Sequence, residues 1–87
     1  MNTENKKRSA MVYVKLKDGV LDPQGVTIKR ALENMGYDEI KDVRSGKTFQ
    51  ITFSPDGKRK PEDLIEEICR KLLTNPVIEN YRFEISQ

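Results

Sequence analysis

The sequence predicts an α+β fold of the ferredoxin-like class, in which two helices cover one face of a four-stranded antiparallel sheet. Several segments alternate apolar and polar residues, as half-buried strands do, and two longer segments repeat apolar residues with helical spacing. These segments follow one another in the order β-α-β-β-α-β. The 87 residues suffice for one small domain, which we expect at residues 10–87 after a flexible N-terminal tail at residues 1–9.

The first strand is predicted at residues 11–17, where Val12, Val14 and Leu16 point to one face and the residues between them point to the other. A helix follows, because an apolar stripe with the spacing i, i+3, i+4, i+7 comes next. The members of this stripe are Ile28, Ala31, Leu32 and Met35. Gly36 is well placed to end the helix.

The turn before this helix, Asp22-Pro23-Gln24-Gly25, has two interpretations. In the first, Asp22 caps the helix and Pro23 takes the first helical position, where a missing N–H costs nothing. In the second, the turn binds a phosphate, but Asp22 would repel a phosphate and Pro23 removes one donor. We therefore favour the cap. It leaves Gly25 unexplained, and we hypothesise that another chain closely approaches the Gly25 backbone.

The middle of the sequence predicts two more strands. Residues 39–46 read as a charged edge strand around Val43. Gly46 and Lys47 would form a type II′ hairpin turn. The strand after it, residues 48–53, is the most regular of the chain, and its core face would carry Phe49, Ile51 and Phe53.

The second helix and the last strand follow the loop at residues 54–61. The apolar stripe of the helix consists of Leu64, Ile65, Ile68, Cys69, Leu72 and Leu73. The sequence TNP ends the helix, and the final strand turns Tyr81, Phe83 and Ile85 inward.

The chain contains no His and a single cysteine, Cys69. These counts exclude an internal disulfide, a multi-cysteine zinc site and His-based acid–base catalysis. Because Cys69 lies on a helical apolar stripe, we interpret it as a small core residue and not as a nucleophile. We therefore predict no catalytic, cofactor-binding or metal-binding residues in this chain.

Composition also bears on partners and location. No apolar run approaches the roughly 20 residues that a membrane span needs, and the polar N-terminal segment lacks the apolar stretch of a secretory signal. We expect a soluble, cytoplasmic protein that does not bind membranes. The formal net charge of +2 is small for a nucleic-acid-binding surface.

The sheet face away from the helices is predicted to be polar and flat enough to meet a partner. It would carry Tyr13, Lys15, Gln50, Thr52, Arg82 and Glu84. RNA-recognition domains share this topology, but they stack bases on exposed aromatic residues, whereas Phe49 is in phase with the core. Arg44 and Lys47, and the basic run at residues 58–60, are either solvated or bind a phosphate or a carboxylate.

Several segments together resemble one family. They are VYVKLKDGVLDPQG, LDPQGVTIKRALENMGY, VRSGKTFQITF and EICRKLLTNPVIENYRFEI, and they span about residues 11–86. The chain is similar in these segments to PurS, the small subunit of bacterial phosphoribosylformylglycinamidine (FGAM) synthase. Ser45 departs from the pattern, since the family usually has an aliphatic residue there.

The resemblance implies a subunit without chemistry of its own. The complex of this family makes FGAM from formylglycinamide ribonucleotide, glutamine and ATP in purine synthesis. A PurL-type synthetase subunit uses ATP and Mg²⁺, a PurQ-type glutaminase subunit releases ammonia, and paired PurS subunits connect them. On this basis we select Gln24, Gly25, Arg44 and Lys47 as candidate interface residues and expect no cofactor in this chain.

Three alternatives remain at this stage. A small regulatory module of the same topology would bind an amino acid at a dimer interface and would be stabilised by that ligand. An RNA-binding domain would bind single strands in a salt-dependent manner. A stand-alone enzyme is the third alternative, and the missing His and nucleophile argue against it.

Overall fold

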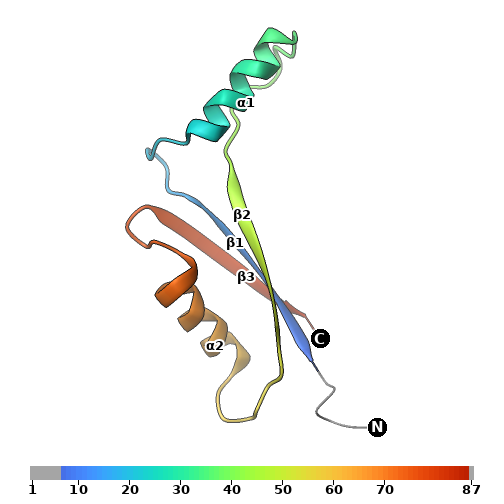
Figure 1. Ribbon diagram of the computed structural model, residues 1–87, viewed down its shortest axis with the longest axis vertical. Helices are drawn as coiled ribbons and strands as arrows, with labels where there is room; N and C mark the ends of the chain where they lie inside the picture. The colour runs from blue at the N-terminus through green and yellow to red at the C-terminus, as the bar shows by residue number, and fades with distance from the viewer. Residues whose placement is uncertain (1–6, 87) are drawn as a thin grey trace.

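The computed structural model describes residues 7–86. Its elements follow in the order β1 (Arg8–Leu16), α1 (Pro23–Asn34), β2 (Gly46–Phe53), α2 (Pro61–Ile68), the π-helical turn η2 (Cys69–Leu73) and β3 (Glu79–Ser86). β1 lies in the centre of the sheet and pairs antiparallel with β2 on one side and with β3 on the other (Figure 1). The predicted antiparallel α+β character is confirmed.

The core lies between the sheet and α2. Ala10, Val12 and Val14 alternate along β1 and are buried, together with Ile65 and Cys69 from the helical side. The apolar residues of the outer strands pack against this cluster as the alternation predicted, and they are Phe49, Ile51, Phe53, Tyr81, Phe83 and Ile85. Complete burial of one Ile or Val side chain contributes about 1.5–3 kcal/mol to the free energy of folding. The burial of these few residues therefore supplies most of the attraction between the sheet and α2.

A π-helical turn changes the end of the second helix. The Thr74 N–H donates to the Cys69 carbonyl at 3.1 Å, a bond that spans five residues and therefore rotates the side chains that follow Cys69. Leu73 packs against the core, whereas Leu72 is 79% exposed. The prediction that Leu72 belongs to the core face was wrong, because it assumed an unbroken α-helical period.

The predicted fourth strand and hairpin are absent from the described residues. The segment at residues 39–45 has no strand conformation, and Gly46 and Lys47 begin β2 instead of forming a turn. Backbone groups in this segment bond to nearby carboxylates: the Val43 N–H donates to Asp42 at 3.0 Å and the Ser45 N–H donates to Asp22 at 2.6 Å. Such bonds compete with the ladder of a sheet, so a charged segment with a single apolar residue does not pair.

Helix α1 does not cover the sheet. It extends beyond one end of the strands, while α2 lies against the sheet (Figure 1). The molecule is accordingly elongated, with extents of 56 × 31 × 15 Å. The expectation of two helices on one face was therefore wrong for α1, and its apolar stripe is left for another surface.

The start of the domain lies earlier than predicted. Arg8 and Ser9, assigned to the tail, belong to β1, where Arg8 pairs with Phe53 of β2 and Ser9 with Ser86 of β3. The rest of the predicted tail, residues 1–6, lies outside the described residues. None of the helices in the described range is long and apolar enough to cross a membrane.

Candidate subunit interface

The N-terminus of α1 is fixed by Asp22, which is only 4% exposed. Its carboxylate accepts hydrogen bonds from the Gly25 N–H at 3.0 Å, the Ser45 N–H at 2.6 Å and the Ser45 hydroxyl at 2.7 Å. These bonds, with those from Ser45 the strongest, lower the pKa of the Asp22 carboxyl below its usual value. The predicted cap is confirmed, and its own carboxylate occupies the place that a phosphate would take.

Gly25 is buried inside this corner. A Cβ atom on Gly25 would lie 2.3 Å from the Val43 carbonyl oxygen and 2.8 Å from the nearer Asp22 carboxylate oxygen. Val43 of the same chain therefore makes a close approach of the kind that the sequence suggested, and this is enough to explain the glycine, while a contact of Gly25 with another chain stays a prediction. Gly25 allows the helix start and the segment around Val43 to pack closely.

The other three candidate residues lie near this corner. Gln24 is exposed in the first turn of α1. The guanidinium group of Arg44 donates to the carbonyl oxygens of Leu16 at 3.3 Å and Lys17 at 3.1 Å. Arg44 thus holds the end of β1 against the segment that leads into β2.

Lys47 lies at the start of β2, on the same end of the sheet. Its ammonium group is 3.7 Å from the Glu79 carboxylate and 5.8 Å from the centre of the Phe49 ring, and its side chain is 53% exposed. Both contacts leave part of the charge in water, where such pairs contribute little to stability. Lys47 and Gln24 therefore stay candidates for contact with another subunit.

An exposed apolar face on and around α1 is the feature that the sequence analysis missed. Ile28 and Met35 form this face on the helix, and Leu21, Val26, Tyr37 and Ile40 are further exposed apolar side chains in and around α1, with Val26 on the opposite side of the helix. We expected Ile28 and Met35 in the core, but Met35 is 68% exposed. Periodicity identified this stripe correctly, and nothing in the local sequence tells which surface it covers. An apolar face of this extent on a small protein is typical of an interaction surface.

Residues 7–86 bring no three His, Cys, Asp or Glu side chains together around a possible metal position. Cys69 is buried, and burial raises the pKa of its thiol, which disfavours the reactive thiolate. Tyr81 donates to Glu66, and this bond raises the pKa of Tyr81 to about 12. These groups hold α2 on the sheet.

The comparison with known families agrees with this geometry. A family model described as PurS, phosphoribosylformylglycinamidine (FGAM) synthase, matches residues 9–87, which is nearly the whole chain. The chain belongs to the PurS family.

Individual PurS proteins are similar to this chain along most of its length. The PurS subunit of FGAM synthase from Bacillus subtilis is 47% identical over 76 residues, which cover 87% of this chain and 89% of the relative. A crystal form of B. subtilis PurS has a TM-score of 0.82 at 45% identity and covers 92% of this chain and 99% of the other. The fold of this chain is thus similar to that of B. subtilis PurS.

A structure of PurLQS from Thermotoga maritima also contains a similar chain. The TM-score is 0.81 at 29% identity, and the match covers 92% of this chain and 98% of the other. This chain is therefore similar to one of the chains in the T. maritima structure named PurLQS.

Proposed function

We propose that this chain is the non-catalytic PurS subunit of FGAM synthase and that it holds a synthetase subunit and a glutaminase subunit together. The observation that supports this most directly is the match over 92% of the chain to a chain of the T. maritima PurLQS structure. The exposed apolar side chains around α1 agree with such a role. The reaction converts formylglycinamide ribonucleotide, glutamine and ATP into FGAM, glutamate, ADP and phosphate.

The physical role of such a subunit is coupling. Ammonia that leaves the glutaminase is diluted and protonated in water, so the two active sites must be held in register. A subunit that binds both partners raises their effective concentration toward each other. ATP and Mg²⁺ would then act in the synthetase subunit, no cofactor is needed in this chain, and the complex would work in the cytoplasm.

We further propose that the apolar face around α1 binds a second copy of this chain. A helix of 12 residues is marginal in water unless its apolar side is covered. In the described residues α2 alone covers the sheet, so the domain has one helix fewer on its core than the ferredoxin-like arrangement requires. A symmetric pair would cover the two α1 faces at once and extend the core of each protomer.

A reconstitution assay tests the coupling role. FGAM formation is measured with the cognate synthetase and glutaminase, with and without this chain, first with glutamine and then with an ammonium salt. We expect the chain to raise the glutamine-dependent rate by at least about tenfold, since coupling acts on effective concentration, and to leave the ammonium-dependent rate unchanged. An unchanged glutamine-dependent rate and no binding to either subunit would overturn the proposal and favour a small ligand-binding module.

A further inference from the structure

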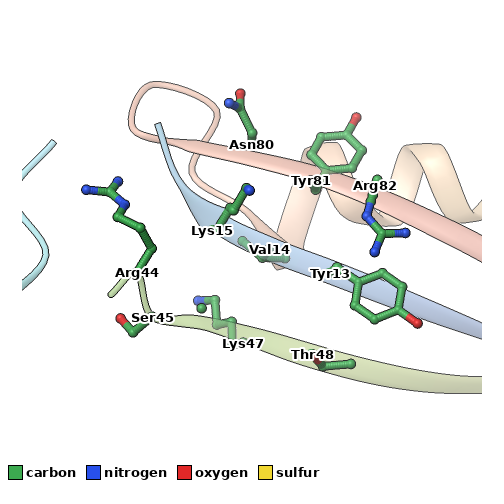
Figure 2. Close-up of a pocket in the computed structure, with 11 residues that line it drawn as sticks. Tyr13, Val14, Lys15, Arg44, Ser45, Lys47, Thr48, Asn80, Tyr81 and Arg82 are labelled. Atoms are coloured by element: carbon green, nitrogen blue, oxygen red, sulfur yellow. The ribbon is translucent and has the colours of Figure 1, made fainter. Parts of the chain in front are cut away.

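A cleft of about 420 Å³ lies at the end of the sheet from which the chain leaves toward α1. Its lining includes Tyr13, Lys15, Arg44, Lys47, Thr48 and Arg82 (Figure 2). Most of these side chains lie on the face of the sheet that points away from α2. That face takes no part in the hydrophobic core. The volume falls in the range of about 300–1,000 Å³ that is usual for ligand pockets and exceeds what a single small ion fills.

The register of the sheet explains why these side chains meet. Tyr13 of β1 lies directly opposite Thr48 of β2 and Arg82 of β3, and these three residues form one row across the sheet. Lys15 lies in the next row, opposite Gly46 and Asn80. Neighbouring rows on one face bring a phenol, a hydroxyl, an amide and two cations within reach of one ligand.

The charge of the cleft is positive. Four of the lining residues are cationic, although Lys47 pairs with the buried Val14 and so lies on the α2 side of the sheet, and none of the described residues that line the cleft carries a carboxylate. Two carboxylates contact lining residues: Glu84 accepts from Arg82 at 3.1 Å and from the Tyr13 hydroxyl at 3.4 Å, and Glu79 lies 3.7 Å from Lys47. Lys15 and Arg44 belong to none of the ion pairs within residues 7–86. Lys15 therefore keeps an uncompensated positive charge in the cleft, whereas the charge of Arg44 also acts on the Asp22 carboxylate and helps to lower its pKa.

The cationic groups are also held in place. The Arg44 guanidinium donates to backbone carbonyl oxygens, and the Arg82 guanidinium lies 4.2 Å from the centre of the Tyr13 ring (Figure 2). A guanidinium that is already ordered loses less conformational freedom when an anion binds. The stacked pair of Arg82 and Tyr13 adds a planar surface beside the charges.

We propose that this cleft binds a phosphate-bearing ligand of the phosphoribosyl class, with Lys15 and Arg82 on the phosphate and Thr48 and Asn80 on sugar hydroxyl groups. Lysine and arginine are the usual protein partners of phosphate. The phosphoribosyl part of the proposal rests on the proposed function, because the product of FGAM synthase carries that group, whereas the anion site rests on the cleft alone. Binding there would let the subunit sense a substrate or product of the complex.

Binding to the isolated chain tests the proposal without the other subunits. Ribose 5-phosphate, inorganic phosphate and ribose are titrated at equal ionic strength, and the amide NMR signals and the Tm are recorded. We expect ribose 5-phosphate to raise the Tm and to shift signals of Lys15, Thr48 and Asn80. Ribose should do neither, and inorganic phosphate should bind more weakly than the sugar phosphate.

A pair of double variants identifies the site. Lys15→Gln with Arg82→Gln should weaken ribose 5-phosphate binding at least about tenfold, because hydrogen bonds to charged groups are the strong ones. Lys58→Gln with Arg70→Gln makes the same charge change outside the cleft and should leave binding unchanged.

No signal shift with ribose 5-phosphate, or equal weakening in both variants, would overturn the anion site. Equal binding of inorganic phosphate would overturn the phosphoribosyl class. Failure of the reconstitution assay would leave all these results intact, so the two proposals fail separately.

Discussion

Asp22 holds Ser45 through two hydrogen bonds, although 23 residues separate them in the sequence. The same carboxylate caps α1 by accepting from the Gly25 N–H at 3.0 Å. One side chain therefore joins the start of α1 to the segment that enters β2. This contact fixes the direction in which α1 leaves the sheet, and with it the position of the exposed apolar face.

Removal of the Asp22 carboxylate should destabilise this corner more than removal of the Ser45 hydroxyl. Ser45→Ala deletes one hydrogen bond and should lower the free energy of unfolding by about 1 kcal/mol. Asp22→Ala deletes three bonds and leaves two N–H groups without their partner, so its urea midpoint should be clearly lower. Urea unfolding followed by circular dichroism measures both variants, and equal midpoints would contradict the role of the carboxylate.

The Asp22 contact should also respond to acid. Hydrogen bonds from Ser45, followed by the bond from Gly25, lower its folded-state pKa below the ordinary 3.8. A lowered folded pKa stabilises the fold above the unfolded value, and this contribution is lost as the pH falls through the folded pKa. Stability from this group should therefore be constant at neutral pH and decline below about pH 4.

Site-specific NMR is needed to observe this titration. Glu67 has its pKa lowered to about 2 by Lys71 and Arg59, so whole-protein stability would mix the two carboxylates. The carboxyl carbon of Asp22 should titrate below 3.8, and Ser45→Ala should move its pKa upward. An Asp22 pKa at or above the ordinary value in the unsubstituted chain would show that the Ser45 bonds do not form.

Gly25→Ala gives a prediction whose sign separates two effects. Helix propensity alone would make alanine more stable by roughly 1 kcal/mol. A Cβ atom 2.3 Å from the Val43 carbonyl oxygen forces the backbone apart, and we expect a net loss of about 2 kcal/mol or more. Gln24→Ala, at the exposed neighbouring position, serves as the control and should change stability by no more than about 0.5 kcal/mol. A stabilised Gly25→Ala variant would disprove the close contact.

Charge on the apolar face of α1 should prevent self-association. Ile28→Lys with Met35→Lys should raise the dissociation constant of the pair at least about tenfold, because buried apolar residues dominate such interfaces. The control Asn34→Lys adds a lysine to the same helix away from the stripe. It should leave the mass of the assembly in solution the same as that of the unsubstituted chain. Sedimentation equilibrium reports the mass, and circular dichroism checks that α1 is still folded. An unchanged mass in the double variant would exclude this face from the self-contact.

Reversal of two charges near the corner tests Arg44 and Lys47 as interface residues. Arg44→Glu with Lys47→Glu should weaken binding to the synthetase or the glutaminase at least about tenfold. The reason is that like charges brought together at an interface slow association and favour release. Lys58→Glu with Lys60→Glu has the same net charge and should bind as the unsubstituted chain does. Surface plasmon resonance with each partner subunit gives the dissociation constants. Unchanged affinity in the first variant would remove Arg44 and Lys47 from the interface.

The sequence alone predicted those features that depend on neighbouring residues. Alternation along β1 placed Val12 and Val14 in the core, and Asp22 was correctly assigned as the cap of α1. The helical spacing also identified Cys69 as a core residue. Each of these predictions needs only the local period or a bond between residues three positions apart, which the order of residue types specifies.

The tertiary structure decided the features that depend on distant residues. Whether the stripe of Ile28 and Met35 faces the sheet or solvent depends on the direction in which the chain leaves β1, and the bonds from Asp22 to Ser45 set that direction. Gly25 was explained only when Val43 came to lie against it. The physical reason is that an amphipathic segment specifies that one side must be covered, while the surface that covers it is chosen by long-range packing.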